Sequence, residues 1–469
     1  MEVLQRTANR GSVSTGPYEI DNSLKLERAN SEQVRATGTT DSGNRKTWTF
    51  STWIKRTEIS YNGGFGINAL FYAASTGMQI NSNDKISIRM YTGSAYTGDL
   101  LTTQVFRDTS AWYHIVWTLD TTQSTSSDRI KLWINGQQVT NFDTETYPGL
   151  NDEFQIGEAG AASPIRIGNG YWGSSPFSAY IAETHYLNGT AKQASDFGEY
   201  DADSGIWIPK EYTDGGYGDI GFYYKFDNAS SLGEDSSGEG HDANGLVNVT
   251  SADQATDTPT NNFCTWNPLW AYQYQPTIKE GATVAAYGDS TDENAKATIG
   301  LTNGKWYWEA KPSGTIGSQF IGISTDGDSN ISSGQGLTQN YQMTIEPQGR
   351  YYSYAGSLSE SSAGQFTALT TSDTLGIALD MDSSTQTIKY YANGSLILTR
   401  DLITEMQGRT VFPFLQNYES RTFNINFGGY TINTISSAAS DANGYGTFEY
   451  APPSGYYAIC TKNLAEYGG

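Results

Sequence analysis

The chain has 469 residues, of which 28 are Lys or Arg and 50 are Asp or Glu, so its formal net charge is −22. Diffuse negative charge opposes binding to a phosphate backbone or an anionic membrane, so we expect neither nucleic acid nor an anionic membrane as a partner. No apolar stretch approaches 18 residues, so we expect no membrane insertion. Charged residues make up only 17% and aromatic residues 13%, a composition that favours packed cores over disorder or long charged surface helices.

The first segment in chain order is polar and carries Gly and Ser, so we expect residues 1–19 to form an arm rather than a domain. Met1–Arg6 lacks a charged region followed by an apolar one, and therefore predicts no secretory signal. Arg6 and Arg10 stand out from an acidic chain. They are candidates for docking onto an acidic partner protein, although a solvated arm fits them equally well.

Residues 20–235 form the first strand-rich block, because apolar and polar residues alternate there with a period of two. The clearest strand is Arg129–Ile134, which runs into Asn135-Gly136. That pair is favoured in type I′ hairpin turns because both residues tolerate positive φ. Within this block we expect one short helical turn, over residues 193–200.

The second half of the chain shows the same period-two alternation of apolar and polar residues. Residues 236–279 are polar and predict a linker or surface crossing. Residues 280–430 form a second strand-rich block, in which Thr387–Ala392 runs into another hairpin pair, Asn393-Gly394. Residues 431–469 are expected to be a C-terminal appendage. The predicted fold class is therefore all-β, with two tandem antiparallel β-sandwiches.

The first block resembles the concanavalin A-like, laminin-G-like jelly roll. The resemblance rests on residues 111–117, on 128–139 with the Asn-Gly turn, on 165–168, and on 177–183, which is similar to the closing strand of that family. Several motifs in the family's order, over about 200 residues, carry the resemblance together.

The second block resembles a SPRY domain. Its most specific part is the strand Asp373–Asp380 followed by the Asn393-Gly394 hairpin. The other matching segments are Gly304–Glu309, Phe320–Ile323, Val411–Leu415 and Phe423–Gly428.

The tandem of these two domains resembles virion proteins of marine bacteriophages. Val3–Ser12, Gly43–Trp48, Thr103–Asp108 and Pro452–Gly455 are the segments that carry the resemblance. It implies a tail-fibre-like or capsid-appendage protein that assembles in the host cytoplasm and is then extracellular on the virion.

Aromatic loops are the candidate glycan-binding sites, because aromatic rings stack on the apolar faces of sugars while Asn and Asp bind sugar hydroxyls. The loop with Asn169, Tyr171 and Trp172 is the first candidate, and the alternative is that Trp172 plugs the end of the sandwich. Tyr352 and Tyr354, which alternation places on one face of a strand, form the second. Protein interfaces use the same residue types, so docking onto another virion subunit stays open.

Calcium is the one metal ion we consider, since laminin-G-like domains often hold it through oxygen ligands. Asp120 follows a strand and is the best-placed acid of the first domain. Asp326 and Asp328 alternate like the start of a calcium loop, but no distal Glu follows them and a hairpin turn is the alternative. No cofactor is required by any motif.

Catalytic motifs are scarce. His114 and His185 fall in strands, where a hydrogen-bonded structural role is expected, and His241 falls in the polar linker, where we expect it to be solvated. Cys264 and Cys460 have no CxxC partner, and two buried thiols are favoured over one bridge. We therefore expect no enzyme activity.

The sequence-based hypothesis is a non-enzymatic virion protein that attaches to a host-surface polysaccharide and contacts other virion proteins. A purely structural subunit and a polysaccharide depolymerase are the alternatives. A trimer is plausible for a fibre, but the chain has no heptad or β-helix repeat to support one.

Overall fold

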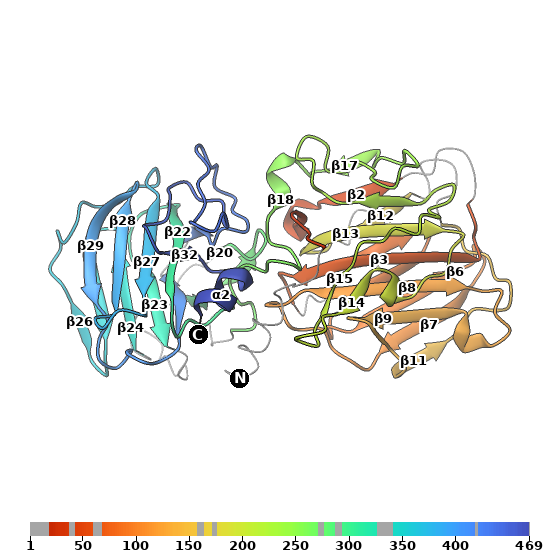
Figure 1. Ribbon diagram of the computed structural model, residues 1–469, viewed down its shortest axis with the longest axis horizontal. Coiled ribbons are helices and arrows are strands. Elements are labelled where there is room, and N and C mark those ends of the chain that lie inside the picture. The colour runs from red at the N-terminus through yellow and green to blue at the C-terminus, as the bar shows by residue number, and fades with distance from the viewer. Residues whose placement is uncertain are drawn as a thin grey trace. The chain divides into compact units, whose positions relative to one another are not determined.

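The computed structural model describes residues 18–36, 43–59, 68–156, 164–170, 176–270, 276–286, 293–325, 341–417 and 421–468. They form two compact units, residues 14–260 and 261–469, which we call the jelly-roll unit and the C-terminal unit. Both consist almost entirely of antiparallel sheets, and within the described ranges the single α-helix is α2 (Thr461–Tyr467) (Figure 1). The all-β fold predicted from the period-two pattern is confirmed.

The first sheet of the jelly-roll unit has the strand order β10-β9-β8-β3-β13-β1-β18, and β16 also pairs with β13. Its strands are β1 (Ser23–Leu26), β3 (Thr47–Arg56), β8 (Tyr113–Asp120), β9 (Ile130–Ile134), β10 (Gln137–Gln138), β13 (Ala179–Asn188), β16 (Phe222–Tyr224) and β18 (Gln254–Ala255).

The second sheet of the jelly-roll unit has the order β11-β7-β6-β5-β4-β12-β2-β17. Its strands are β2 (Gln33–Ala36), β4 (Ala69–Ala73), β5 (Thr76–Ile80), β6 (Ile86–Tyr91), β7 (Tyr96–Thr102), β11 (Phe142–Thr146), β12 (Ile165–Ile167) and β17 (Gly245–Val247). Four 3₁₀ turns and a two-stranded ribbon complete the described part of the unit: η1 (Arg28–Asn30), η2 (Ser126–Asp128), η3 (Ala194–Asp196), η4 (Ser251–Asp253), β14 (Gly198–Tyr200) and β15 (Trp207–Pro209). Of residues 193–200, where a helical turn is expected, only Ala194–Asp196 form one, η3, whereas Gly198–Tyr200 form β14.

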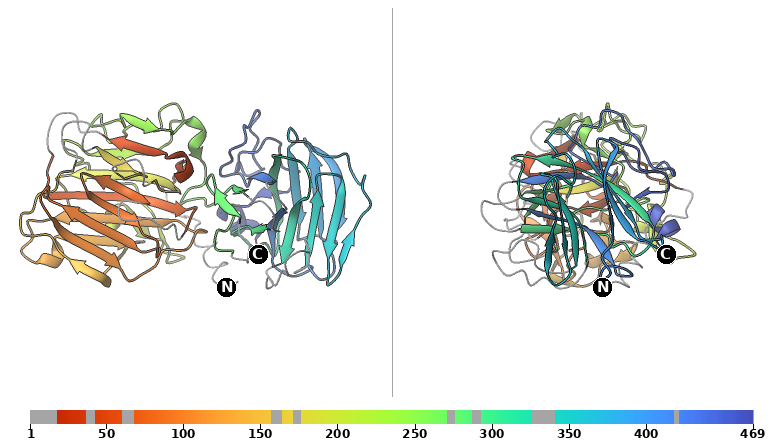
Figure 2. Two further views of the ribbon diagram at one scale, coloured as in Figure 1. Left: turned by 180° about the vertical axis from the view of Figure 1, so that it is seen from behind. Right: turned by 90° about the vertical axis from the view of Figure 1, so that its left-hand side faces the viewer.

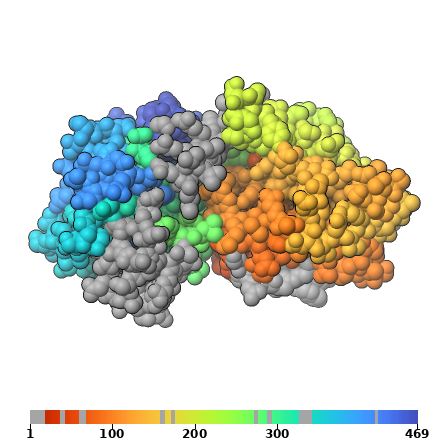
Figure 3. Space-filling view, turned by 90° about the horizontal axis from the view of Figure 1, so that it is seen from below, coloured from red at the N-terminus to blue at the C-terminus, as the bar shows by residue number. Residues whose placement is uncertain are grey.

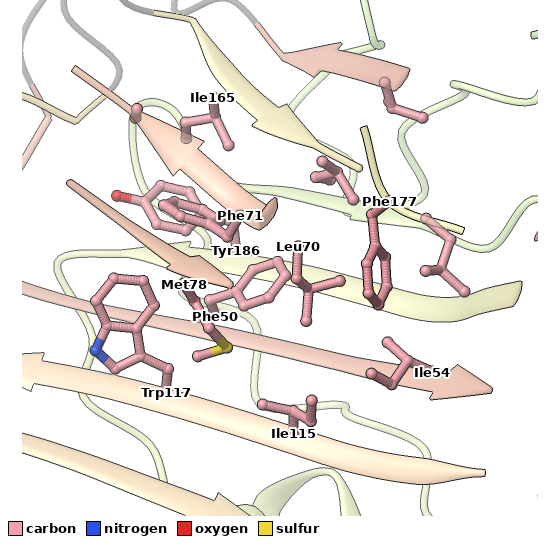
Figure 4. Packing of buried hydrophobic residues seen from close by; sticks show 14 of the residues in the cluster. Phe50, Ile54, Leu70, Phe71, Met78, Ile115, Trp117, Ile165, Phe177 and Tyr186 are labelled. Carbon is pink, nitrogen blue, oxygen red and sulfur yellow. The ribbon is translucent and has the colours of Figure 1, made fainter. Parts of the chain in front are cut away.

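The core of the jelly-roll unit lies between these two sheets. Alternation along β3 sends Trp48 and Phe50 into it, where both rings meet Phe71 from the second sheet. Figure 4 shows Phe50 and Phe71 within this core. Trp48 and Trp117 are fully buried and pack edge to face, with ring centroids 4.6 Å apart. Fully burying a side chain such as Phe50 contributes about 1.5–3 kcal/mol, so this aromatic centre stabilises the sandwich strongly.

The segment 236–279, expected to be a linker or a surface crossing, is divided between the two units. Residues 245–247 and 254–255 are β17 and β18, which pair with β2 and β1 at the ends of the two sheets. Asp257 of the same segment forms a buried ion pair with Lys55, 2.6 Å from carboxylate oxygen to Nζ. Polar composition does not reveal this role, because residues 245–257 contribute mainly edge pairing and a buried charge. Trp266, further along the segment, is fully buried in the core of the C-terminal unit.

The C-terminal unit also has two large sheets, which Figure 2 shows from behind in cyan and blue. One has the order β19-β20-β31-β22-β27-β28-β29 with β32 on β22, and the other β21-β30-β23-β24-β25-β26. The first contains β19 (Thr277–Lys279), β20 (Val284–Ala286), β22 (Lys305–Ser313), β27 (Leu375–Asp380), β28 (Thr387–Ala392), β29 (Ser395–Asp401), β31 (Thr422–Asn426) and β32 (Tyr457–Ala458). The second contains β21 (Glu293–Lys296), β23 (Gln319–Thr325), β24 (Gln342–Glu346), β25 (Arg350–Tyr354), β26 (Leu358–Glu360) and β30 (Val411–Asn417).

Residues 431–469, expected as an appendage, are built into this unit. Glu309 on β22 is buried, and its carboxylate accepts backbone N–H groups of Glu449 and Tyr450, both at 2.8 Å. Tyr457 pairs with Trp306 through β32. The chain's last strand and helix therefore cover the outer face of a sheet whose inner face holds the main core.

Both cysteines are buried and neither is in a disulfide, which confirms their assignment as buried thiols. Cys264 lies in the main core of the C-terminal unit, and burial raises the pKa of Cys460 to about 12. His241 differs from expectation, since its ring Nδ1 lies 2.7 Å from the carbonyl oxygen of Gly221.

Candidate functional site

The β9–β10 hairpin closes one edge of the first sheet. Asn135 (φ 48°) and Gly136 (φ 79°) both have the positive φ that a type I′ turn requires, which confirms the predicted hairpin. The Asn135 side-chain oxygen accepts a hydrogen bond of 2.7 Å from the backbone N–H of His114. The turn is therefore fixed to β8 as well as to its own strands.

A groove of about 610 Å³ opens at this edge, within the range of small-ligand sites. Its walls come from both sheets, because residues 103–104 follow β7 whereas residues 134–138 belong to the hairpin. In Figure 3 the gold surface of residues near 140 lies next to the orange surface of residues near 100. The lining residues carry no charged side chain and are Thr103, Gln104, Tyr113, Ile134, Asn135, Gln137, Gln138, Val139, Thr140 and Asn141.

Several polar groups of the groove are available to a ligand. Gln104, Gln138 and Asn141 are exposed. Within the ranges that the structure describes, the side chains of these three residues form no hydrogen bond with another residue. A side-chain amide both donates and accepts, so the three together offer paired donors and acceptors above an apolar floor of Ile134 and Val139.

Tyr113 supplies the aromatic surface of the groove. Its ring packs edge to face on Phe106, with centroids 5.7 Å apart, and its hydroxyl accepts the backbone N–H of Asp108 at 3.0 Å. Burial, with the nearby Asp108 carboxylate, raises the pKa of Tyr113 to about 12. The phenol therefore stays protonated at neutral pH and keeps one O–H to donate.

A buried polar layer supports the groove from the opposite face of the first sheet. His114, which follows Tyr113 on β8, is 1% exposed and stacks on Trp53 with centroids 4.7 Å apart. Its Nε2 lies 2.9 Å from the Ser51 hydroxyl, and its Nδ1 lies 3.0 Å from the Trp207 indole nitrogen. Burial, and secondly the nearby His185, lowers the pKa of His114 to about 3.

A second polar cluster lies on the same outer face, where a register shift of β13 against β3 interrupts the ladder. Glu183 sits at this shift with φ 48°, a strained conformation for a residue with a side chain. Its carboxylate accepts hydrogen bonds from the hydroxyls of Tyr18 (2.7 Å) and Tyr223 (2.5 Å). His185 stacks on Tyr223 with centroids 4.0 Å apart. Both phenols donate to the same oxygen, Oε2, of this carboxylate, so the cluster holds Tyr18 on the sheet.

The predicted aromatic loop is described only in part. Tyr171 and Trp172 lie outside the described residues. Asn169 is fully buried and its side-chain oxygen accepts the backbone N–H of Gly170 at 2.8 Å. Asn169 therefore shapes its own turn rather than presenting an amide to solvent.

The predicted tyrosines of the C-terminal unit share one face of β25, as alternation indicated. Tyr351 packs toward the core, whereas Tyr352 lies on the other face and is 6% exposed. The Tyr352 hydroxyl donates to Glu346 at 2.9 Å and its ring packs edge to face on Phe320. Tyr354 is half-buried one step further along the strand.

The calcium candidates gain no support from the described residues. The Asp120 carboxylate accepts hydrogen bonds from the hydroxyl of Thr122 (2.6 Å) and the amide of Gln123 (2.6 Å), so both of its oxygens are hydrogen-bonded within the loop. Within the described ranges, no three His, Cys, Asp or Glu side chains form a group suited to a metal ion. Asp326 and Asp328 lie outside those ranges, as do Arg6 and Arg10.

Sequence reasoning missed the groove residues. Gln137 and Gln138 follow the hairpin turn directly, and two consecutive exposed glutamines on a sheet edge are the one local signal that marked the position. Thr103, Gln104 and Asn141 carry no such signal, because only the closure of one sheet over the other brings them beside the hairpin.

Residues 28–195 match the protein-family model described as the concanavalin A-like lectin/glucanases superfamily, Laminin_G_3. The jelly-roll unit therefore has a lectin-like fold. No curated protein matches the chain. No helix in the described part is both long and apolar enough to cross a membrane.

Among solved structures, the chain is similar to two SPRY domains and to a bacterial protein. The TRIM65 PSpry domain shares 13% identity over 35% of this chain and 89% of its own, with TM-score 0.27. The SPRY domain of human HERC1 shares 13% over 34% and 94%, with TM-score 0.26. A Bacteroides ovatus protein provisionally described as carbohydrate binding shares 15% over 49% and 60%, with TM-score 0.35.

Proposed function

We propose that the jelly-roll unit binds a neutral polysaccharide in the groove at the β9–β10 edge. The observation that carries the proposal is the uncharged, amide-rich lining beside an aromatic ring. All ten lining residues fall inside the segment 28–195 that matches a lectin-containing family, which supports the same reading.

The chemistry of the groove suits a sugar. Each sugar hydroxyl both donates and accepts a hydrogen bond, and so do the amides of Gln104, Gln138 and Asn141. The apolar C–H faces of a pyranose fit against Tyr113 and Val139. The lining has no Lys or Arg to pair with sulfate or uronate groups, which favours a neutral glycan over an acidic one.

Binding without cleavage is the second part of the proposal. Glycoside hydrolysis generally uses two carboxyl groups about 5–9.5 Å apart across the bond that breaks. None of the groove-lining residues is Asp or Glu, which supports a role in binding alone. A reducing-sugar assay on the bound polysaccharide tests this, and release of oligosaccharides would overturn it.

A glycan array with neutral and acidic polysaccharides tests the binding itself. The parent protein should bind at least one neutral glycan, and the double variant Gln138→Ala/Asn141→Ala should bind it at least tenfold more weakly, because two polar contacts are lost. Gln123→Ala is the matched control, since it removes an exposed amide beyond the other end of β8. Equal binding by the parent and the double variant would remove the groove as the site.

We further propose that this binding serves adhesion on a bacteriophage virion, as a tail fibre or capsid appendage that contacts other virion proteins. The support is the resemblance of Val3–Ser12 and Gly43–Trp48 to virion segments of marine phages. Antibody labelling of virions is the test, and it should place the protein on the particle surface with the groove accessible. A groove covered by neighbouring subunits would instead favour a purely structural role.

A further inference from the structure

An exposed aromatic residue, Tyr200, lies beside the groove. Gln137, which lines it, also donates its side-chain N–H to the hydroxyl of Tyr200, and that hydroxyl lies 3.3 Å from the carbonyl oxygen of Asn135. Tyr200 is 47% exposed although it is a large aromatic residue. An exposed ring is thus held directly beside the groove by two of the groove's own residues.

The position of Tyr200 is fixed rather than adjustable. Its ring packs edge to face on Trp207, its partner across the β14–β15 ribbon, with centroids 4.9 Å apart. Trp207 in turn fits against two glycines, because a Cβ at Gly136 or Gly198 would lie only 2.4 or 2.5 Å from the indole. The hairpin that forms the groove and the ribbon that carries Tyr200 therefore meet through one closely packed indole.

Exposed apolar residues adjoin the groove. In the described part of the jelly-roll unit, the large apolar side chains with high exposure are Tyr96, Val105, Leu150 and Tyr200. Val105 follows Gln104 of the groove wall, and Tyr200 contacts Gln137, so two of the four adjoin the groove. An exposed aromatic ring beside an uncharged polar groove offers a surface on which the next sugar of a glycan chain can stack.

We infer that Tyr200 forms a second sugar subsite, so that the unit recognises several consecutive sugars of a neutral glycan chain rather than one terminal sugar. The chain would lie in the groove against Tyr113 and continue past Gln137 onto the ring of Tyr200. This inference rests on the proposed function, since it uses the same groove as its first subsite.

Calorimetric titration of the full chain with neutral oligosaccharides tests it. The probes are the cello-, laminari-, manno- and agaro-oligosaccharides of two, four and six sugars. Affinity of the parent should rise with length in the series that binds. Tyr200→Ala should lower affinity for the six-sugar probe about tenfold, while affinity for the two-sugar probe stays within twofold.

Two control variants separate stacking from other effects. Tyr200→Phe keeps the ring and loses only the hydroxyl, so it should keep the dependence on length. Tyr96→Ala removes a ring of equal exposure, 47%, from the second sheet and should leave all affinities unchanged. Circular dichroism of each variant verifies that the fold is kept.

The outcomes distinguish this inference from the proposed function. If no neutral series binds the parent, the groove is not a neutral glycan site and both proposals fail. If the parent binds two and six sugars equally well, or if Tyr200→Ala binds the six-sugar probe as the parent does, the second subsite is refuted while the groove remains. A rise in affinity with length that Tyr200→Ala abolishes supports it.

Discussion

The indole N–H of Trp207 donates a hydrogen bond to Nδ1 of His114 across 3.0 Å. Because an indole nitrogen can only donate, Nδ1 of His114 must be the unprotonated nitrogen of the ring. The ring proton is therefore on Nε2, which donates to the Ser51 hydroxyl at 2.9 Å. A second ring proton, on Nδ1 of His114, would point its N–H at the indole N–H of Trp207. His114 must therefore be neutral in the folded unit.

Acid should therefore destabilise the jelly-roll unit. The pKa of His114 is lowered to about 3 in the folded state, mainly by burial, against 6.5 when unfolded. A lowered pKa means that the unfolded state takes up the proton first, so stability is complete above about pH 6.5 and falls as the pH drops below it. At about pH 5 the loss should be about 2 kcal/mol for this residue.

Urea unfolding followed by tryptophan fluorescence, at neutral pH and at about pH 5, measures the effect. His114→Gln removes the titrating group and should show about 2 kcal/mol less dependence on pH than the parent. Burial also lowers the pKa of His185, so some dependence should remain in this variant. An identical loss of stability in both proteins would contradict the assignment.

Gly136→Ala should both destabilise the unit and weaken glycan binding. The residue has φ 79°, and an added Cβ would lie 2.4 Å from Trp207. The backbone conformation alone costs about 1–2 kcal/mol, and the displaced indole adds to that cost. Gly205→Ala is the control, because Gly205 has φ 71° but its Cβ would meet nothing within 4 Å. Equal unfolding midpoints for the two variants would show that the Trp207 contact is unimportant.

Asp257→Ala should destabilise the jelly-roll unit, because Asp257 lies in the polar segment 236–260 that completes this unit. Lys55 and Asp257 are 0% and 1% exposed, so the variant leaves an ammonium group buried without this partner. The expected cost is about 3–5 kcal/mol. Asp128→Ala breaks the exposed pair with Lys131 and should cost less than about 1 kcal/mol. Thermal denaturation compares the two, and similar small losses would contradict the buried role.

Glu309→Ala should weaken the attachment of residues 431–468 to β22. The variant deprives the N–H groups of Glu449 and Tyr450 of their acceptor, which should cost about 1–3 kcal/mol. Limited proteolysis after residue 430 should then become faster than in the parent. Glu405→Ala removes an exposed carboxylate and should leave the cleavage rate unchanged.

The strands and hairpins follow from local sequence. Alternation around Trp48 and Phe50 and the pair Asn135-Gly136 predicted strand faces and a turn that the structure contains, because the period-two pleat and positive φ are properties of a few neighbouring residues. The same alternation placed Tyr352 and Tyr354 together on one face. It could not show that Tyr352 would be buried against Phe320, a residue more than thirty positions away.

By itself, the sequence determined the all-β class, the two sandwich-forming blocks and the positions of both Asn-Gly hairpins. The tertiary structure alone decided that residues 236–260 complete the first sandwich, and that Gln104, Gln138 and Asn141 line one groove beside Tyr200. The physical reason is that strand formation depends on near neighbours, whereas a groove at a sandwich edge depends on which distant strands the two sheets place beside each other.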